Sequence, residues 1–543
     1  MKVDRIDYRR LPGQSPLLLS YLYDFDRVSD FYPALPQSSE TVLRRLHRVQ
    51  ENPRFSRKLL LDLLRPFNES IGCSGATFEN LRKLEDSATV AILAGQQVGL
   101  FGGPSYSAYK AVTAIGLARS LAEIGVTAVP VFWMASDDSD FDEVRSTQFT
   151  GENGWVETID YPDLREFKEQ MAGTVRLDNL APCLERVAAI TRPDQRPRLL
   201  DDLLGASYRE GRTFRQAFAH WLSQLFGEYG LILFDPLLEG YRAELGGLFE
   251  EVIRQREGLL ETLSKRNEQL EARGFPVQVN PDPAETFLFV VDGERRYKLE
   301  YRNGQFIEKG RSSHRYTDKE LISRLQSGEI QLGPNVLLRP IVQDHLFPTL
   351  MTVGGPSEVA YYSQITALSS YWDLEMVVYP RVGFTVVDPK SQRLMKKYDL
   401  NTLEILNLEP DLLAERLLRQ VDSAETLSGF DSLRENLGEQ LAVLRGRLEN
   451  ADPTVAAMLD NASRKISYQV DKVSRRYVTN QVLKEGDLKR HLDYLLGHLR
   501  PSGALQERSL NFNALMSLSG EDMISSLIDS VKLESPGHRI ILL

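Results

Sequence analysis

Five carboxylates crowd residues 137 to 143, and their types and spacing suit proton transfer or metal binding. Carboxylates held close together repel one another, and this repulsion can raise the pKa of one of them to a value that suits a general base. One or two of their oxygens would also suit Mg²⁺. A solvated acidic loop that caps a helix explains the pattern equally well, since Asp142 and Glu143 favour a helix N-terminus. We predict that Asp137, Asp138 and Asp140 are catalytic.

A glycine-rich turn occupies residues 95 to 104. Glycine lets the backbone turn sharply and approach a ligand, and the amides of Gln96 and Gln97 both donate and accept hydrogen bonds. The turn is neither a P-loop nor a dinucleotide fingerprint, because it lacks their lysine and glycine spacing. A plain strand-to-helix connection is the alternative. We predict ligand binding by Gly95, Gln96, Gln97, Gly99, Gly103 and Tyr106.

A second glycine-proline turn at residues 354 to 358 precedes a helical pattern, so two helix N-termini would face one cleft. Arg339 and Arg381 each follow an expected strand, where a guanidinium can bind a carboxylate or phosphate. Lys110 is more typical of a solvated lysine, and His345 of a structural histidine. A plain turn is again the alternative. The binding residues predicted here are Arg339, Gln343, Gly354, Gly355, Glu358, Tyr361 and Arg381.

Short apolar runs predict the strands that position these residues, at 90–94, 129–134, 231–234, 336–338, 376–379 and 384–387. In an open parallel sheet, ligands bind at the carboxyl ends of the strands, near helix N-termini. The first glycine turn and the acidic cluster fall at such ends. Hairpin patterns over 286–310 interrupt the series and indicate an insertion. The predicted fold class is α/β, a Rossmann-like parallel-sheet core with inserted connecting segments.

Leucines spaced by threes and fours from 433 to 448, and a second apolar series from 455 to 477, predict two long helices joined at Asp452-Pro453. Such helices pack as an α-helical antiparallel coiled-coil domain. The predicted boundaries are 1–85 for a helical cap, 86–150 for the first half of the core, 151–334 for connecting helices and the hairpin insertion, 335–400 for the second half of the core, 401–500 for the coiled coil, and 501–543 for a tail that docks on the core.

The 543-residue chain is 42% hydrophobic and 26% charged, with a formal net charge of −11. This composition predicts a soluble protein with a real core, and the acidic balance argues against bulk nucleic-acid binding. Neither the two cysteines nor the seven histidines have metal-type spacing, so we assign no metal ligands. No signal peptide or membrane span is indicated, and we expect a cytoplasmic protein.

Four long blocks resemble the BshC family: AGQQVGLFGGPSYSAYKA, VPVFWMASDDSDFDEV, NVLLRPIVQDHLFPTLMTVGGPSEVAYYSQI and PSGALQERSLN. They occur in the family's order, and the resemblance covers nearly the whole chain. It implies a core similar to class I synthetases, a coiled-coil domain and a homodimer. The apolar residues Leu412, Leu413, Leu417 and Leu418 also favour a dimer. One departure is Ser139, where family members often have histidine, so no role of that histidine carries over.

The resemblance implies bacillithiol biosynthesis, in which the carboxyl group of cysteine is joined to the amine of glucosaminyl malate. Because an amide does not form well from a free carboxylate in water, we expect carboxyl activation by ATP, with Mg²⁺ as a candidate ion. Arg339 and Arg381 are the candidates for binding the malate carboxylates. The alternative is a nucleotide-binding scaffold or regulatory protein built on a degenerate Rossmann core, because no strict nucleotide motif is present.

Overall fold

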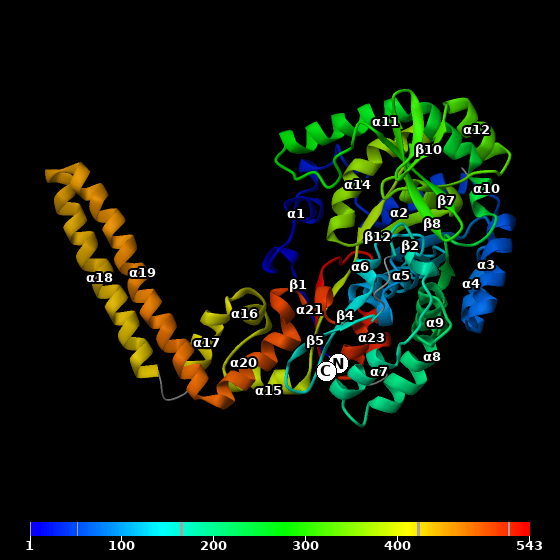
Figure 1. Cartoon of the computed structure of the whole chain (residues 1–543). Helices are drawn as coiled ribbons and strands as arrows, with labels where there is room; N and C mark the ends of the chain where they lie inside the picture. The colour runs from blue at the N-terminus through cyan, green and yellow to red at the C-terminus, as the bar shows by residue number, and fades with distance from the viewer. Residues whose placement is uncertain (1, 52, 163–166, 421–423, 520–521) are drawn as a thin grey trace. The chain divides into compact units, whose positions relative to one another are not determined.

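A five-stranded parallel sheet forms the core of the chain, as a computed structural model of residues 2–51, 53–162, 167–420, 424–519 and 522–543 shows (Figure 1). Its strand order is β13-β12-β2-β3-β6. The chain runs from β2 through β3 to β6 on one side, then returns to β12 and β13 on the other. The order therefore reverses between β2 and β12, where ligands bind in sheets of this kind. The strands are β2 (Val90–Gln96), β3 (Ala128–Met134), β6 (Ile232–Phe234), β12 (Thr349–Gly354) and β13 (Val378–Pro380).

Helices cover both faces of this sheet, which explains why its strands read as continuous apolar runs. Alternate residues such as Leu93 and Val131 belong to a large buried cluster that also includes side chains of α14 (Pro356–Ser369). Helix α5 (Tyr106–Ala122) packs on β2 and β3 and is buried almost all round. A helix that is apolar on every side must be enclosed, and α23 (Met523–Asp529) packs against α5.

The predicted insertion forms a second, antiparallel sheet in the order β10-β9-β8-β7-β11. Its hairpins follow the turn signals in the sequence, since Asp292-Gly293 and Asn303-Gly304 lie between paired strands. The elements are β7 (Glu285–Asp292), β8 (Arg295–Arg302), β9 (Gln305–Glu308), β10 (Arg311–Tyr316), α12 (Asp318–Gln326) and β11 (Gln331–Pro334).

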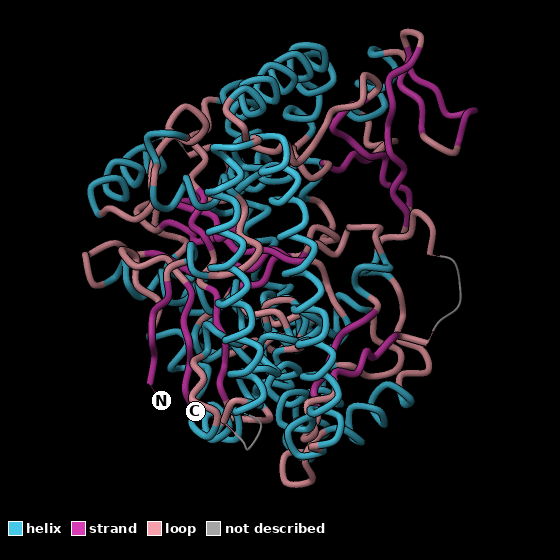
Figure 2. Tube along the Cα trace, turned by 90° about the vertical axis from the view of Figure 1, so that its left-hand side faces the viewer, coloured by secondary structure: helices cyan, strands magenta, loops and turns pink. Residues whose placement is uncertain are grey.

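The remaining elements up to β14 are mostly helical, including the predicted N-terminal cap. The first and last strands of the chain, β1 and β15, lie side by side next to the labelled chain ends (Figure 2). The elements are β1 (Lys2–Ile6), α1 (Pro16–Tyr23), α2 (Ser39–Glu51), α3 (Arg57–Ile71), α4 (Gly75–Lys83), α6 (Phe141–Val144), β4 (Ser146–Thr150), β5 (Val156–Asp160), α7 (Ala181–Ile190), α8 (Gly205–Ser207), α9 (Phe214–Phe226), α10 (Tyr241–Glu244), α11 (Gly246–Ala272), α13 (Arg339–Leu346), β14 (Gly383–Val387) and β15 (His538–Leu542).

The chain divides into two compact units. The first comprises Met1–Phe149, Glu157–Thr385 and Glu507–Ile541, and it contains the parallel sheet; the second comprises Thr150–Val156, Val386–Gln506 and Leu542–Leu543. The helices after β14 are α15 (Pro389–Lys397), α16 (Thr402–Asn407), α17 (Pro410–Leu418), α18 (Ala424–Ala451), α19 (Pro453–Lys484), α20 (Gly486–Leu499), α21 (Gln506–Ser509) and α22 (Phe512–Met516).

Helices α18 and α19 form the predicted antiparallel hairpin (Figure 1). Asp452 caps α19, because its carboxylate accepts from the Thr454 N–H at 3.0 Å, and Pro453 takes the first helical position. Part of the predicted seam is nevertheless exposed: 45% of Leu433 and 45% of Leu444 are accessible. The apolar pattern is therefore wider than the contact between the two helices requires.

Three strand assignments differ from the sequence prediction. Residues 336–338 form a turn before α13, since Asn335 Oδ1 accepts the N–H groups of Leu337 and Leu338 at 3.0 Å. Strand β14 pairs with β15, outside the parallel sheet. Strand β12, which lies between β13 and β2 in the sheet, was not predicted. In the part of the chain that the structure describes, no helix combines the length and apolar character of a membrane span.

Candidate active site

A cleft of about 780 Å³ lies at the carboxyl ends of the core strands. Residues after β2 and β3 and the start of α14 form one side, and β7 and β8 of the insertion contribute the other. The sequence-predicted residues that line it are Gly95, Gln96, Gln97, Tyr106, Asp137, Asp138, Arg339, Gly355, Glu358, Tyr361 and Arg381. The two glycine turns and the acidic cluster therefore meet in one place.

The acidic turn presents two carboxylates with different surroundings. Asp138 is fully engaged: Oδ1 pairs with Arg296, and Oδ2 accepts from Gln97 Nε2 at 2.9 Å. Asp137 lies deeper, with 15% of its side chain exposed. Burial raises the pKa of the Asp137 carboxyl, while the nearby Arg296 and Arg242 guanidiniums oppose part of that rise. A buried carboxylate with a raised pKa is the better general base of the two.

Lys110 is a buried part of the cleft, so the expectation of a solvated lysine is wrong. Only 3% of the residue is exposed. Its Nζ donates to the Gly95 carbonyl at 2.6 Å and to Gln96 Oε1 at 2.8 Å, and it pairs with Glu358. Burial lowers the pKa of Lys110, and Glu358 opposes that shift. Because Glu358 also accepts from the Gly355 N–H at 2.8 Å, this ion pair joins the two glycine turns.

The arginines of the cleft fall into two groups. Arg381 forms a bidentate pair with Glu507, with nitrogen–oxygen distances of 2.9 and 2.6 Å, and both residues are buried. Its predicted role in binding a carboxylate substrate does not fit this pairing. Arg339 donates to Gln343 Oε1 at 3.1 Å and has no carboxylate partner within the described residues. Arg508 is exposed on the cleft and likewise has no ion-pair partner in the described chain.

Five predicted site residues lie outside the cleft lining. Asp140 caps the short helix α6 by accepting from the Glu143 N–H at 3.3 Å, so it does not fit a catalytic role. Gln343 is fully buried and donates to Thr352 Oγ1 at 2.8 Å, which orients Arg339 from behind. Gly354 ends β12, where its carbonyl accepts from the Arg381 N–H at 2.8 Å. The other two are Gly99 and Gly103.

Gly99 and Gly103 shape the first glycine turn, which several buried side chains hold in place. The Tyr208 hydroxyl donates to the Gly99 carbonyl and accepts from the Gly102 N–H, both at 2.7 Å. Asn511 Nδ2 donates to the Phe101 and Gly103 carbonyls at 3.0 and 2.9 Å. These contacts fix Phe101 at a positive φ of 51°, a conformation that costs free energy unless its surroundings enforce it.

Replacing Gly99 by valine should lower activity more than stability. A Cβ at Gly99 would meet Gly103 Cα at 2.9 Å and Gly103 N at 3.1 Å, so the turn must shift and move Gln96 and Gln97. A displacement of about 1 Å costs roughly 100-fold in rate, and we expect kcat/KM to fall by that order. Gly75→Val is the control, because its Cβ meets nothing within 4 Å. An unfolding midpoint that falls in proportion to activity would instead indicate a plain structural turn.

Several cleft residues were not predicted from the sequence. Arg296 and Lys298 come from β8 of the insertion, and the hairpin pattern gave no sign that this sheet faces the cleft. Lys110 was named but placed in solvent. The signal for Arg508 was present, because it lies in the block PSGALQERSLN that resembles the family. Periodicity alone cannot show that a segment 400 residues after the glycine turn returns to it.

Comparisons with known proteins agree with this architecture. Residues 1–382 match the family described as "Bacillithiol biosynthesis BshC, N-terminal Rossmann-like domain", and residues 384–543 match "Bacillithiol biosynthesis BshC, C-terminal coiled-coil domain". A protein of Solibacter usitatus (strain Ellin6076) named "Putative cysteine ligase BshC" is 30% identical over 538 residues, which cover 98% of each chain. A protein of the same name from Koribacter versatilis (strain Ellin345) is 30% identical, with 99% of each chain covered. Another from Salinibacter ruber (strain DSM 13855 / M31) is 28% identical and covers 97% of this chain and 96% of its own.

A strand-end cleft in a Rossmann-like sheet, joined in sequence to a helical hairpin domain, defines a two-part α/β protein. Both parts match the same family in the same order along the chain. The chain belongs to the BshC family, which confirms the resemblance seen in the sequence.

Proposed function

We propose that this protein is a cysteine ligase of bacillithiol biosynthesis that acts in the cytoplasm. It joins the carboxyl group of cysteine to the amine of glucosaminyl malate. The observation that carries the proposal is the arrangement of the cleft, in which the buried carboxylate of Asp137 shares one cavity with Arg339 and Arg508. The Asp137 carboxylate can accept the proton that the amine must lose, and the two arginines can bind the carboxylates of malate.

In the proposed reaction, the amine nitrogen attacks the activated cysteine carboxyl carbon. A C–N bond forms, the bond from that carbon to the activating group breaks, and the departing oxygen keeps the electron pair. Asp137 receives the proton that the nitrogen loses. Arg339 and Arg508 hold the malate carboxylates, and Gln96 and Gln97 orient polar groups of the substrates. Lys110 is held by Glu358 and keeps the two turns together.

We propose that ATP activates the cysteine carboxyl, and that Mg²⁺ accompanies the nucleotide. Beyond the two arginines assigned to malate, the cleft offers Lys298 of β8 as a positive charge for the phosphates; its Nζ lies 2.8 Å from the Glu285 carboxylate. Within the described residues, no three histidine, cysteine or carboxylate side chains converge as a metal site. An ion would therefore be held chiefly by the phosphates, as Mg²⁺ often is. ATP would supply a leaving group on the cysteine carboxyl.

The test is to incubate the protein with cysteine, glucosaminyl malate and ATP and to detect the product by mass spectrometry. We expect a product whose mass is the sum of both substrates less one water. Arg339→Gln and Arg508→Gln should each weaken glucosaminyl malate binding by about 10-fold or more, the value of a charge-assisted contact. Arg339→Lys should weaken it less than Arg339→Gln, because it keeps the charge but loses the planar fork. Affinity for glucosamine alone is the control; equal losses for both ligands would contradict the assignment.

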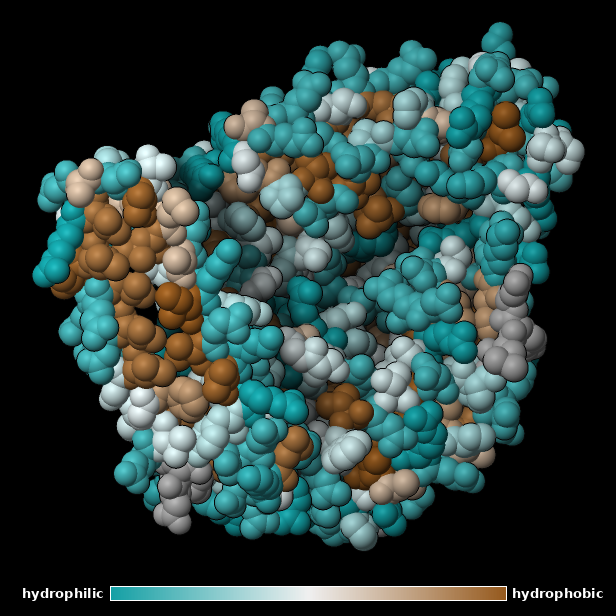
Figure 3. Space-filling model, turned by 60° about the vertical axis from the view of Figure 1, so that its left-hand side comes forward, coloured by the Kyte–Doolittle hydropathy of each residue, from teal (hydrophilic) through white to brown (hydrophobic). Residues whose placement is uncertain are grey.

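We also propose a homodimer that forms through the coiled-coil hairpin. Of the leucines that first suggested a dimer, only Leu412 is exposed. The hairpin itself carries a broad apolar surface (Figure 3), which includes Val443 and Met458 at 58% and 66% exposure. Apolar surface of this kind commonly marks a protein interface. Light scattering at micromolar concentration should give a dimer, which Val443→Glu combined with Met458→Glu should dissociate. Val443→Leu should leave it intact, and a monomeric wild type would exclude the proposal.

A further inference from the structure

The carboxylate of Asp137 is buried but accepts no hydrogen bond from the described part of the chain. Its side chain is 15% exposed, and one cation among the described residues lies within 4 Å of it. This cation is Arg242 of α10, whose Nη2 lies 3.8 Å from Oδ2. Asp138 differs, because Arg296 and Gln97 occupy both of its oxygens. Of these two carboxylates, Asp137 is therefore the one whose oxygens remain free to accept a proton.

Neighbouring segments fix the backbone on both sides of Asp137. The Ser136 carbonyl accepts from the Gly173 N–H at 2.8 Å, and the Asp138 carbonyl accepts from the Ala172 N–H at 2.6 Å. This support places the Asp137 side chain but does not keep it ionised, because burial favours the neutral form of a carboxyl group. The ionised form therefore depends on a nearby positive charge.

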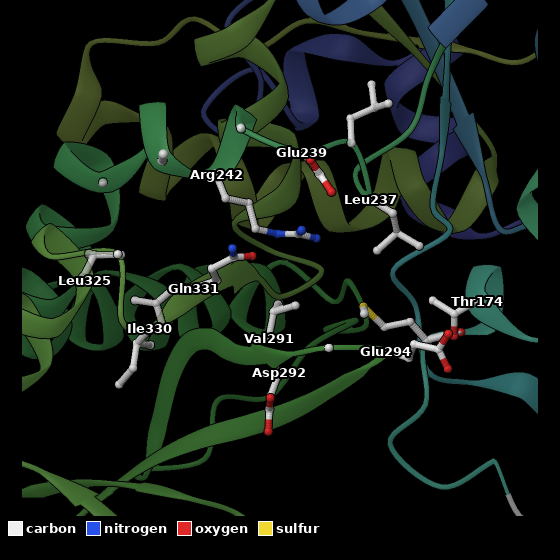
Figure 4. Close-up of a pocket in the computed structure, with 18 of the residues that line it drawn as sticks. Thr174, Leu237, Glu239, Arg242, Val291, Asp292, Glu294, Leu325, Ile330 and Gln331 are labelled. Atoms are coloured by element: carbon white, nitrogen blue, oxygen red, sulfur yellow. Dashed lines mark hydrogen bonds between the residues drawn. The ribbon is translucent and has the colours of Figure 1, made fainter. Parts of the chain in front are cut away.

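Arg242 supplies a guanidinium that has few other partners. Its side chain is 9% exposed, and its Nε and Nη2 form no hydrogen bond within the described chain. The guanidinium lies over the buried ring of Tyr241, with Cζ 5.0 Å from the ring centroid. Arg242 also lines a groove of about 1270 Å³, in which Figure 4 shows the guanidinium between Leu237, Glu239 and Gln331.

The carboxylates of this groove do not compete for the guanidinium. Five of them line the groove, but among the described residues only Asp137 lies within ion-pairing distance of Arg242. Because electrostatic attraction falls with distance and with exposure to water, the charge of Arg242 acts chiefly on Asp137. Three of the five carboxylates have cations of their own, in the pairs Glu250–Arg254, Asp292–Arg311 and Glu329–Arg324, and the other two are Glu239 and Glu294.

Other titratable groups also face the Asp137 carboxylate from the elements around it. The first two of them neutralise each other as an ion pair, and Asp235 is paired with Arg215 at 3.1 Å. Within the described chain, Arg242 is thus the cation near Asp137 that no other carboxylate neutralises. The groups are Arg296 of β8, Asp138 of the same turn, Asp235 after β6 and the hydroxyl of Tyr241.

We propose that Arg242 is a positioning residue for the reaction proposed above, and that its guanidinium holds the Asp137 carboxylate ionised and in place at the cleft. The inference rests on that proposed function. The distance of 3.8 Å suits this role, since the positive charge attracts the carboxylate while no hydrogen bond occupies the oxygen that must accept the amine proton. Arg381 and Glu507 are the opposite case, because two hydrogen bonds occupy that carboxylate.

The pH profile of kcat/KM for Arg242→Gln tests this role. This parameter reports the titration of the free enzyme, and loss of the guanidinium should raise the pKa of Asp137 further. The rising limb of the profile should therefore move to higher pH. Below this limb, kcat/KM should fall about tenfold or more, and the loss should shrink as pH rises. Arg242→Lys keeps the positive charge and should restore most of the wild-type profile.

A purely structural role of Arg242 would give a different result, in which kcat/KM falls by the same factor at every pH and Arg242→Lys restores nothing. Arg242→Met removes the same charge without leaving a buried polar group, so it repeats the test if Arg242→Gln does not fold. Arg254→Gln is the control, because it removes an arginine of α11 that is 61% exposed, and it should leave the profile unchanged.

Combining Arg242→Gln with Asp137→Asn separates this inference from the proposed function. If Arg242 acts through Asp137, its loss should change the residual rate of Asp137→Asn by no more than about twofold, because the interaction is already absent. A wild-type protein that forms no product would overturn the proposed function and this inference with it. A slow Asp137→Asn variant, beside an Arg242→Gln variant whose profile is not shifted, would overturn this inference alone.

Discussion

Asp137→Asn should lower turnover severely while leaving the protein folded. Asparagine keeps the shape of aspartate but cannot accept a proton, and loss of general-base catalysis lowers rates by about 10²–10⁴-fold. Because only the ionised carboxylate can act as the base, the wild-type rate should rise with pH through the raised pKa of Asp137. The measurements are kcat for product formation and its pH profile. Asp142→Asn is the matched control, because it makes the same change in the same turn on a side chain that is 91% exposed.

The stability of Asp137→Asn separates this role from a structural one. A carboxyl whose pKa is raised by folding contributes most stability below its unfolded pKa, and that contribution is lost as pH rises through the folded pKa. Above the folded pKa the ionised Asp137 therefore costs stability, and the neutral amide removes that cost. Because the change also removes the carboxylate that lies 3.8 Å from the buried Arg242 guanidinium, the two effects oppose each other, and we expect a thermal midpoint close to that of the wild type. A large drop in the midpoint together with the loss of turnover would mean that Asp137 supports the fold.

The parallel core was predictable because its strands obey local rules. Residues 90–94 and 129–134 are short apolar runs followed by turn residues, and both became core strands. Strand β12 could not be predicted in this way, because Thr349 and Thr352 interrupt its apolar run, although both are buried. Residues 336–338 are apolar enough for a strand, but the side chain of Asn335 binds the backbone and makes a turn. Such competition between a side chain and the strand ladder is invisible to periodicity.

The candidate site was predictable where its residues follow strands, and not where they arrive from distant segments. Gln96 ends β2, Gln97 follows it, and Asp137 lies in the turn after β3, so strand prediction was enough to bring them together. Arg296 reaches Asp138 from 158 residues away, and no local pattern encodes that approach. The pairing of Arg381 could not be foreseen either, since its partner Glu507 lies 126 residues further along the chain.

This pairing makes Arg381→Gln the substitution with the largest expected effect on stability. Glu507 has a side chain only 2% exposed, and besides Arg381 it accepts from the Phe384 N–H at 3.0 Å. Removing one partner of a buried ion pair leaves the other charge uncompensated, at a cost of about 3–5 kcal/mol. Arg381→Met combined with Glu507→Leu removes both charges and should recover much of that loss. Urea unfolding of the three proteins is the measurement.

The pH dependence of the same variant gives a second, independent test. Burial alone would raise the pKa of Glu507, but the attraction of Arg381 brings it below its ordinary value. In the wild type, the stability that this group provides is present above the unfolded pKa and is lost as pH falls through the folded one. Without Arg381, the effect of burial dominates, so the pKa of Glu507 is raised instead of lowered. Protonation of Glu507 then removes the cost of its buried charge and stabilises the variant. The stability difference between Arg381→Gln and the wild type should therefore shrink as pH falls from 7.5 toward 5. The contrary result is an Arg381→Gln variant that is as stable as the wild type and binds glucosaminyl malate as poorly as we expect of Arg508→Gln. That result would contradict the structural role and assign Arg381 to substrate binding.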